Sequence, residues 1–334
     1  MMRLPWFDFR APATVAEAAQ ILAGEGPSAM LIAGGTDLIP NMKRRHQSPK
    51  TLVSLRKVKE LRSVNGTLGA GLTLTDIVDS PQLREKYRGL WQAAAQVATP
   101  HLRNMGTLGG NLCLDTRCTY YNQSQEWRKA IDFCLKKDGE TCWVATASKR
   151  CVAVSSTDTA PALIALDAKV KLVSSQGERE VPLAALYHND GIDYLTRRAD
   201  EILTEVAVPE GWTSSYWKLR RRGSFDFPVL GVAAAVRLAK DGTVQEARIA
   251  LGAVASRPFA VEKAGEFLKG GKLTDEAIAE AGSIVASRAK PMDNTDLDLY
   301  WRKDVVSSFV GHALREVRGD DVREARLRIA RQAL

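Results

Sequence analysis

The sequence predicts an α+β chain: a two-part α/β domain followed by a C-terminal domain with a three-stranded antiparallel sheet and helices. The first part of this prediction rests on apolar strands that run directly into glycine turns and alternate with helical periodicities. The second rests on three alternating runs after residue 211, with Asp241 and Gly242 as a hairpin turn. Because 334 residues exceed the usual size of one hydrophobic core, we expect units at 1–58, 59–209 and 210–334.

The first unit, residues 1–58, is predicted to contain one helix and two short strands. The helix begins at Thr14, which together with Glu17 has the spacing of a capping box. The strands cover 29–33, which ends at a pair of glycines, and 52–55. A helix, a strand, a glycine turn and a second strand make a small α/β unit.

The second and third units are predicted from the same periodicities. The second unit contains, in order, a strand at 68–71, a helix capped by Thr75, a helix at 90–97, a second glycine turn, a helix capped by Asp158, a hairpin around 174–177 and a strand at 201–208. The third contains strands at 214–221, 229–238 and 244–254 and helices at 260–269, 274–288 and 296–317, with Thr274 as the cap of the second helix.

Composition narrows the class of protein. The net charge of +8 comes from basic clusters that are far apart in the sequence, which favours solvated faces and contacts to acidic partners over nucleic-acid binding. No apolar run approaches the roughly 18 residues that span a bilayer, so no membrane span is expected. The N-terminus lacks an apolar signal core, and we expect a cytoplasmic protein with reduced thiols. No Ser-His-Asp or H-E-x-x-H pattern is present, and no catalytic residue is predicted.

Two glycine turns are candidates for binding phosphate. Glycine lets backbone amides approach a phosphate closely, although either turn alone could be a tight turn that needs positive φ. Neither matches the Rossmann or the Walker pattern. The two turns together favour a dinucleotide whose pyrophosphate lies in a cleft between the two α/β halves. The candidate residues are Ile32, Ala33, Gly34, Gly35, Thr36, Asp37 and Leu38 in the first turn, and Thr107, Leu108, Gly109, Gly110 and Asn111 in the second.

All five cysteines lie within residues 113–151, and four of them suggest a metal site. Structural zinc sites usually use close pairs of cysteines, whereas the smallest gap in this set leaves seven residues between ligands. This spacing favours a [4Fe–4S] cluster over zinc, which stays open as the alternative. The predicted ligands are Cys118, Cys134, Cys142 and Cys151, and Cys113 is predicted to be a packed thiol. The segment 113–153 has few aliphatic residues, so it needs such a staple to fold.

Five motifs occur in the order found in the FAD-binding medium subunits of molybdenum hydroxylases, the family of the carbon monoxide dehydrogenase and xanthine dehydrogenase flavoproteins. They lie at 33–38, 107–111, 158–163, 201–205 and 216–218. The chain therefore resembles this family over essentially its whole length, which implies a PCMH-like FAD domain of the vanillyl-alcohol-oxidase type. The sequence departs from the family at Thr36 and Asp37, where many relatives have His-Ser, and in the insertion between Asn111 and Asp158.

The insertion makes the chain similar to the β subunits of 4-hydroxybenzoyl-CoA reductases, whose extra loop holds a [4Fe–4S] cluster. The stretch 115–124 carries much of this resemblance. It implies an electron-transfer oxidoreductase subunit with FAD and a [4Fe–4S] cluster, in a complex that reductively dehydroxylates 4-hydroxybenzoyl-CoA to benzoyl-CoA in aromatic compound degradation. The implied partners are a large molybdopterin subunit and a small subunit with two [2Fe–2S] centres, assembled as an (αβγ)2 heterohexamer, with ferredoxin as the electron donor.

The same resemblance implies roles for individual residues. The two glycine turns would hold the FAD pyrophosphate, Asp158 would hydrogen-bond the ribityl or ribose side, Leu203 would pack near the flavin and Lys218 would anchor a polar edge. From the residues alone, Asp158 is a helix cap and Lys218 a solvent-facing cation. The insertion is expected to face outward, toward a soluble donor.

Three alternatives stay open. The first is the flavin subunit of another molybdenum hydroxylase that acts on an aromatic or N-heterocyclic substrate. The second is a stand-alone FAD oxidoreductase, and the third is a zinc-stapled interaction protein with no redox role. The absorption spectrum of the anaerobically purified protein would separate the redox classes from the zinc protein.

Overall fold

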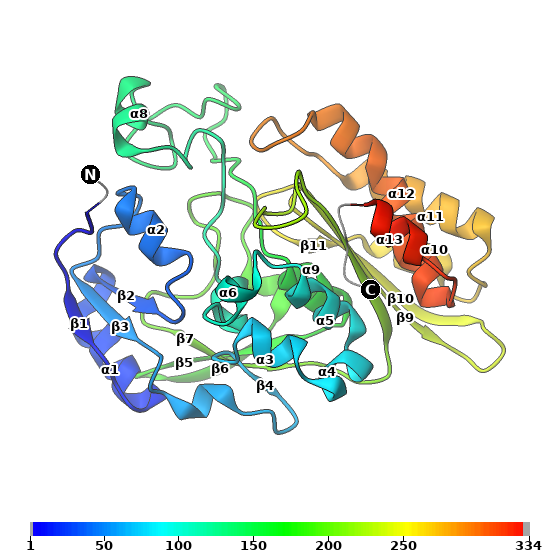
Figure 1. The fold of residues 1–334 in the computed structure, drawn as a ribbon, viewed down its shortest axis with the longest axis horizontal. Helices are drawn as coiled ribbons and strands as arrows, with labels where there is room; N and C mark the ends of the chain where they lie inside the picture. Colours follow the sequence, from blue (N-terminus) through cyan, green and yellow to red (C-terminus); the bar gives the residue numbers. More distant parts are fainter. Residues whose placement is uncertain (1–2, 330–334) are drawn as a thin grey trace.

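The computed structural model describes residues 3–329, in which three sheets pack against helices (Figure 1). The first unit contains β1 (Asp8–Arg10), α1 (Val15–Glu25), β2 (Ala29–Ile32), α2 (Leu38–Lys43) and β3 (Thr51–Ser54). The second contains β4 (Leu68–Gly69), α3 (Leu74–Val78), α4 (Pro81–Lys86), α5 (Arg88–Ala95), α6 (Pro100–Arg103), α7 (Leu108–Leu112), α8 (Gln125–Ala130), α9 (Thr159–Ala165), β5 (Lys169–Ser174), β6 (Gly177–Pro182) and β7 (Ile202–Ala207). The C-terminal unit contains β8 (Thr213–Leu219), β9 (Leu230–Leu238), β10 (Val244–Gly252), β11 (Phe259–Ala260), α10 (Glu262–Leu268), α11 (Asp275–Arg288), α12 (Leu299–Arg318) and α13 (Arg323–Arg328).

The first sheet is parallel, with the strand order β1-β3-β2. Its first helix, α1, begins where the sequence predicts, because the Thr14 hydroxyl accepts a hydrogen bond from the Glu17 amide. The return bond of the predicted capping box differs, since the Glu17 carboxylate accepts from the Ala13 amide. Parallel strands end at the same edge of a sheet, so the segments that follow β2 and β3 lie together there.

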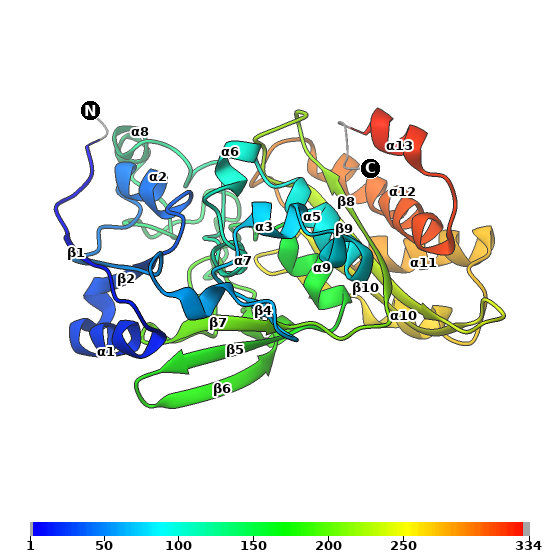
Figure 2. The same ribbon diagram turned by 60° about the horizontal axis from the view of Figure 1, so that its bottom comes forward.

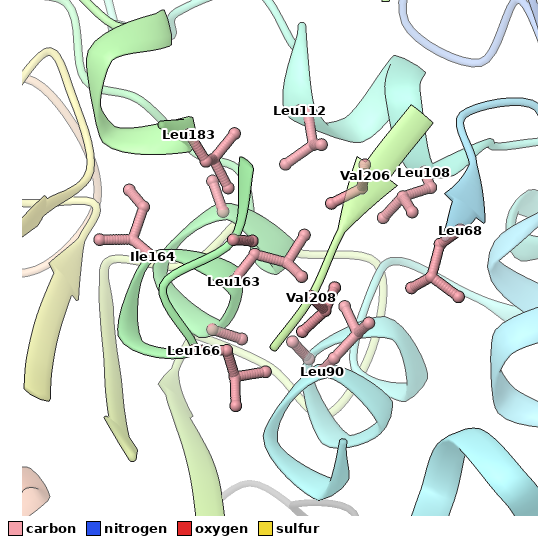
Figure 3. Close-up of a cluster of buried hydrophobic side chains, with 14 of the residues drawn as sticks. Leu68, Leu90, Leu108, Leu112, Leu163, Ile164, Leu166, Leu183, Val206 and Val208 are labelled. Atoms are coloured by element: carbon pink, nitrogen blue, oxygen red, sulfur yellow. The ribbon is translucent and has the colours of Figure 1, made fainter. Parts of the chain in front are cut away.

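The second sheet is antiparallel, in the order β4-β7-β5-β6, and the predicted hairpin joins β5 to β6. Helices α5, α7 and α9 share with this sheet a core that includes Leu108, Leu163 and Val206 (Figure 3). The prediction that Thr75 caps a helix is wrong. The cap of α3 is Thr73, two residues earlier, which forms a complete capping box with Asp76. Thr73 and Asp76 have the S/T-x-x-D spacing of this motif.

The C-terminal sheet is antiparallel in the order β11-β10-β9-β8. The three predicted strands are confirmed, and the structure adds β11, whose two residues are too few to give an alternating pattern. The sheet is buried on both faces. Ala233 and Ala235 of β9 face the core that contains α5 and α9, whereas Val232 and Val236 face the core beneath α10, α11 and α12. Figure 2 shows α5 and α9 on one side of this sheet and α11 and α12 on the other.

The three sheets lie within the three units predicted from the sequence, and the exact boundaries at 58 and 209 stay predictions. Only one face of the third unit's sheet packs on helices of the same unit. The other face packs on helices of the second unit. Of the helices formed by residues 3–329, none combines the length and apolar character needed to cross a membrane.

Candidate functional site: a cleft between two glycine turns

A cleft with a volume of about 1130 Å³ opens between the first and second units. This volume is sufficient for a dinucleotide-sized ligand. Most of the predicted binding residues line it: Ile32, Ala33, Gly34, Gly35, Thr36, Asp37, Leu38, Thr107, Gly109, Gly110, Asn111, Asp158 and Leu203. The two predicted residues that do not line it are Leu108 and Lys218, which are both fully buried. Contact of these residues with a cofactor stays a prediction.

The first glycine turn lies against the backbone that leads into the second. A Cβ at Gly34 would come 1.8 Å from the carbonyl oxygen of Met105, so only glycine permits this approach. Gly35 has a φ of +70°, in the left-handed region that favours glycine. The two glycines therefore serve different purposes, a close approach between the two units and a sharp turn after β2.

The second glycine turn opens the short helix α7. The Thr107 hydroxyl accepts a hydrogen bond from the Gly110 amide at 3.1 Å. Gly109 packs on Ala70, where a Cβ would come within 2.8 Å of the alanine methyl group. The Asn111 side-chain oxygen accepts hydrogen bonds from the hydroxyls of Thr157 and Thr159, at 2.8 and 2.6 Å. Asn111 thus joins this turn to the start of α9 across the insertion.

Four cations that the sequence analysis missed also line the cleft: Arg56, Lys57, Arg62 and Arg197. They suit an anionic ligand such as a pyrophosphate. Arg56 and Lys57 follow β3 and therefore lie at the same sheet edge as the glycine turn after β2. The parallel order of these strands is the signal that could have identified them, because ligands bind at the carboxyl ends of parallel strands.

Asp158 occupies the predicted N-cap position of α9, but its side chain makes no capping hydrogen bond to the helix. One carboxylate oxygen accepts from the Tyr216 hydroxyl at 2.8 Å, and the other lies 3.0 Å from the Lys218 ammonium. Burial raises the pKa of Asp158 and lowers that of Lys218, and the attraction between the two opposes both shifts. Lys218 is fully buried rather than solvent-facing as its alternating strand pattern suggested, because both faces of the C-terminal sheet are covered.

Cys113 and the four predicted cluster cysteines are free thiols. Cys113 packs beside the second-unit core and lines the cleft. Cys118, Cys134, Cys142 and Cys151 are 5 to 8% exposed. Burial raises the pKa of Cys118 to about 11 and that of Cys151 to about 12. The charges of other cysteines in the set also raise these two pKa values: Cys134 and Cys142 act on Cys118, and Cys142 and Cys118 act on Cys151.

In the described part of the chain, the four predicted cysteine ligands are not arranged as a metal site. Among residues 3–329, no group of three or more His, Cys, Asp or Glu side chains is arranged to hold a metal ion. The structure therefore does not show a [4Fe–4S] cluster, and what it shows of the four thiols is that they are buried.

The insertion, which was expected to face outward, does so only in part. Its helix α8 lies at the outer edge of the molecule, beside α2 in both views (Figures 1 and 2). Its first residues, however, enter the wall of the cleft, which Cys113, Leu114 and Asp115 line. The physical reason is that 113–115 directly continue α7, which itself forms part of the cleft.

Comparison with protein-family models gives two matches. Residues 5–211 match the model described as the FAD binding domain in molybdopterin dehydrogenase, and residues 214–317 match that of the CO dehydrogenase flavoprotein C-terminal domain.

Among curated proteins, the aldehyde oxidoreductase FAD-binding subunit of Escherichia coli is 32% identical, over 86% of this chain and 92% of the relative. The nicotinate dehydrogenase FAD-subunit of Eubacterium barkeri is 29% identical, over 90% and 92%. The carbon monoxide dehydrogenase medium chain of Hydrogenophaga pseudoflava is 27% identical, over 93% and 96%.

Solved structures have the same fold. A chain of carbon monoxide dehydrogenase from Hydrogenophaga pseudoflava superposes with a TM-score of 0.76 at 27% identity, covering 94% of this chain and 97% of that one. A chain of quinoline 2-oxidoreductase from Pseudomonas putida gives a TM-score of 0.73 at 25% identity, with coverages of 95% and 98%.

Proposed function

The chain belongs to the FAD-binding subunits of the molybdenum hydroxylase family, and from this we propose that it is the electron-transfer subunit of a complex whose substrate chemistry lies on a molybdenum partner. The observation that carries the proposal is the cleft, which both glycine turns line. FAD binding and a place in an oxidoreductase complex follow from the family. The identity of that complex is what we propose here.

The pyrophosphate of FAD would lie against both glycine turns. Their backbone amides can approach a phosphate, and the cations Arg56 and Lys57 would offset its charge. Leu203 would contribute an apolar surface to the same cleft. Asp158 would hydrogen-bond the ribityl or ribose side of FAD through one of its oxygens, while Lys218 holds the carboxylate in place. Lys218 would then act on the cofactor through Asp158.

A [4Fe–4S] cluster on Cys118, Cys134, Cys142 and Cys151 is the second part of the proposal. Four free, buried thiols in one insertion support it, and the charges of Cys134 and Cys142 act on the Cys118 thiol. Backbone amides are also directed at the sulfurs: those of Tyr120 and Tyr121 at Cys118, and that of Ala153 at Cys151. Such N–H···S bonds favour the thiolate, which is the form that ligates iron. Burial raises the pKa of Cys118 and of Cys151, and a bound metal would supply the positive charge that favours their thiolates.

The complex proposed first is a 4-hydroxybenzoyl-CoA reductase, with a large molybdopterin subunit, a small subunit with two [2Fe–2S] centres and ferredoxin as the donor. The support is the insertion with its four cysteines. The second candidate is the flavin subunit of another molybdenum hydroxylase. It is favoured by relatives that are named for nicotinate and quinoline, which are N-heterocyclic compounds. When bound, FAD and the cluster would accept and pass on electrons, and the residues of this chain supply placement and electrostatics.

The proposal is tested on protein purified without oxygen. The expected result is stoichiometric FAD, about four irons per chain and a broad absorption band near ~400 nm. Cys142→Ser is expected to lower the iron content, and Cys113→Ser, the matched control outside the set, to leave it unchanged. Protein that contains flavin but no iron would exclude the cluster and favour the second candidate. Stoichiometric zinc in place of iron would establish the zinc alternative.

A further inference from the structure

Asp115 is a buried carboxylate in the wall of the cleft. Its side chain is only 4% exposed, yet the residue lines the cleft. One carboxylate oxygen accepts a hydrogen bond from the Tyr121 hydroxyl at 2.9 Å and one from the Gln47 amide at 3.3 Å. The other lies 2.8 Å from the ammonium of Lys136. A buried carboxylate is expensive unless a cation offsets it, so the identity of that cation matters.

Lys136 comes from the middle of the insertion and is itself almost completely buried. Besides Asp115, its ammonium donates to the Thr116 hydroxyl and to the Gly191 carbonyl oxygen, each at 2.5 Å. The rings of Tyr121 and Tyr194 lie 4.7 and 5.2 Å from the ammonium. Three hydrogen-bond acceptors and two aromatic faces fix this cation at the back of the cleft wall.

At the first glycine turn, a second carboxylate that lines the cleft also pairs with a cation of the insertion. Asp37, which lines the cleft, pairs with Arg117 of the insertion. Arg117 also donates to the side-chain oxygen of Asn41 at 2.9 Å, and its guanidinium lies 5.2 Å from the ring of Phe227. The Asp115 amide in turn donates to Asp37 at 3.4 Å. Two neighbouring acids of the cleft wall therefore take their cations from the insertion.

We propose that the insertion completes the electrostatics of the FAD site, and that Lys136 is a positioning residue that neutralises Asp115 in the wall of the FAD cleft. The inference rests on FAD binding and does not depend on the iron–sulfur cluster. Reduction adds negative charge to a flavin, and an uncompensated carboxylate in the same low-dielectric cleft would oppose it. The insertion would then influence the flavin through a fixed charge as well as through any metal it holds.

The test compares full-length variants as purified: Lys136→Met, Asp115→Asn, the double variant and the conservative Lys136→Arg. The readouts are the flavin midpoint potential, from equilibration with redox dyes, and the FAD dissociation constant. Lys136→Met is expected to shift the potential to more negative values and to weaken FAD binding roughly tenfold, as an unpaired buried charge is left behind. Asp115→Asn is expected to shift the potential in the opposite direction. The double variant should return close to the wild-type potential, and Lys136→Arg should retain it.

The matched control is Lys137→Met, since Lys137 is the adjacent lysine and forms a more exposed pair with Asp138. It is expected to leave both readouts unchanged. Unchanged potentials in Lys136→Met and Asp115→Asn, or shifts of the same sign in both, would overturn the proposal. If Lys136→Met does not fold, the sign of the shift in Asp115→Asn decides the question. Wild-type protein that contains no FAD would refute FAD binding itself, and iron analysis of each variant separates loss of the cluster from both outcomes.

Discussion

Gly34 shows how a single residue holds two units of the molecule together. Its Cα lies so close to the backbone of Met105 and Gly106 that a methyl group has no room, although the φ of Gly34 is not in the left-handed region. The next glycine, Gly35, is needed for a different reason, its φ of +70°. Close backbone contact at Gly34 sets the distance between the two glycine turns and thus the width of the cleft.

We predict that Gly34→Ala lowers FAD content and destabilises the chain by several kcal/mol, because the obstructing atoms are backbone atoms that cannot rotate away. FAD absorbance per chain and urea unfolding measure the two effects. The control is Gly24→Ala in α1, where an added methyl group meets nothing within 4 Å. That change is expected to keep FAD and to raise the free energy of unfolding by about 0.5–1 kcal/mol. Full FAD occupancy in Gly34→Ala would show that the two turns can separate without loss of the site.

His46 is a buried imidazole stacked on Tyr121, with ring centroids 3.9 Å apart. Burial, reinforced by the charge of Arg128, lowers its pKa from 6.5 to about 4, while Asp115 acts in the opposite direction. The unfolded chain therefore binds a proton at a pH where the folded chain does not. Stability must rise with pH between about 4 and 6.5, and it is lost as the pH falls through this window.

We predict that the free energy of unfolding falls by about 2 kcal/mol from this group alone when the pH is lowered from 7 to 5. Urea unfolding of the wild type and of His46→Gln at both pH values measures it. The variant should lack this part of the pH dependence. An identical pH dependence in the two proteins would mean that folding does not lower the pKa of His46.

At the scale of elements, α13 is attached to the rest of the molecule by a buried ion pair. Arg326 of α13 pairs with Glu316 of α12, and both side chains are almost inaccessible. Glu316 also accepts hydrogen bonds from the indole of Trp217 at 3.1 Å and from the Gln92 amide at 2.8 Å. The guanidinium of Arg326 lies 4.2 Å from the ring centroid of Trp217. One carboxylate thus connects α13, β8 and α5.

We predict that Glu316→Gln lowers the free energy of unfolding by about 3 kcal/mol or more, because it leaves Arg326 buried without its counter-ion. Glu324→Gln in α13 is the control, since Glu324 forms an exposed pair with Arg328. It is expected to change stability by less than about 1 kcal/mol. Equal effects of the two substitutions, measured by urea unfolding, would show that the buried pair contributes no more than a surface pair.

At the scale of the whole molecule, the C-terminal sheet is shared between the FAD-binding part and the C-terminal helices. Tyr216 and Ala250 belong to the core of the second unit, whereas their neighbours Trp217 and Leu251 belong to the core beneath α12. The ion pair of Lys218 with Asp158 crosses the same boundary. The chain is therefore expected to unfold as one cooperative body despite its two matched family domains.

We predict that Lys218→Met lowers the free energy of unfolding by about 3 kcal/mol or more and keeps a single transition in which flavin release and loss of helix coincide. The control is Lys240→Met at the exposed hairpin of β9 and β10, with an expected change of less than about 0.5 kcal/mol. Circular dichroism and flavin fluorescence are recorded on the same samples. Two separated transitions in the wild type would contradict the shared core.

Local patterns in the sequence were sufficient for most of the elements and for the cleft-lining glycine turns. Hairpin signals, helix caps such as Thr274 and alternating runs depend on neighbouring residues, and the structure bears them out. They failed where two neighbouring residues could each cap the same helix, as Thr73 and Thr75 could. They also failed where an element such as β11 is too short to show a periodic pattern. The cleft cations Arg56 and Lys57 were missed because their position depends on strand order.

The sequence by itself determined the family, the order of the elements and the residue types of the two glycine turns, because these depend on contiguous motifs and on hydrophobic periodicity. Only the tertiary structure decided what Asp158, Lys218 and Asp115 do. A strand pattern cannot tell whether its polar face meets water or another helix, and Lys218 meets Asp158. Likewise, a cysteine-rich insertion looks independent in sequence, yet its lysine and arginine offset carboxylates of the cleft wall. Burial and long-range charge pairing arise from packing between distant segments, and no local pattern encodes them.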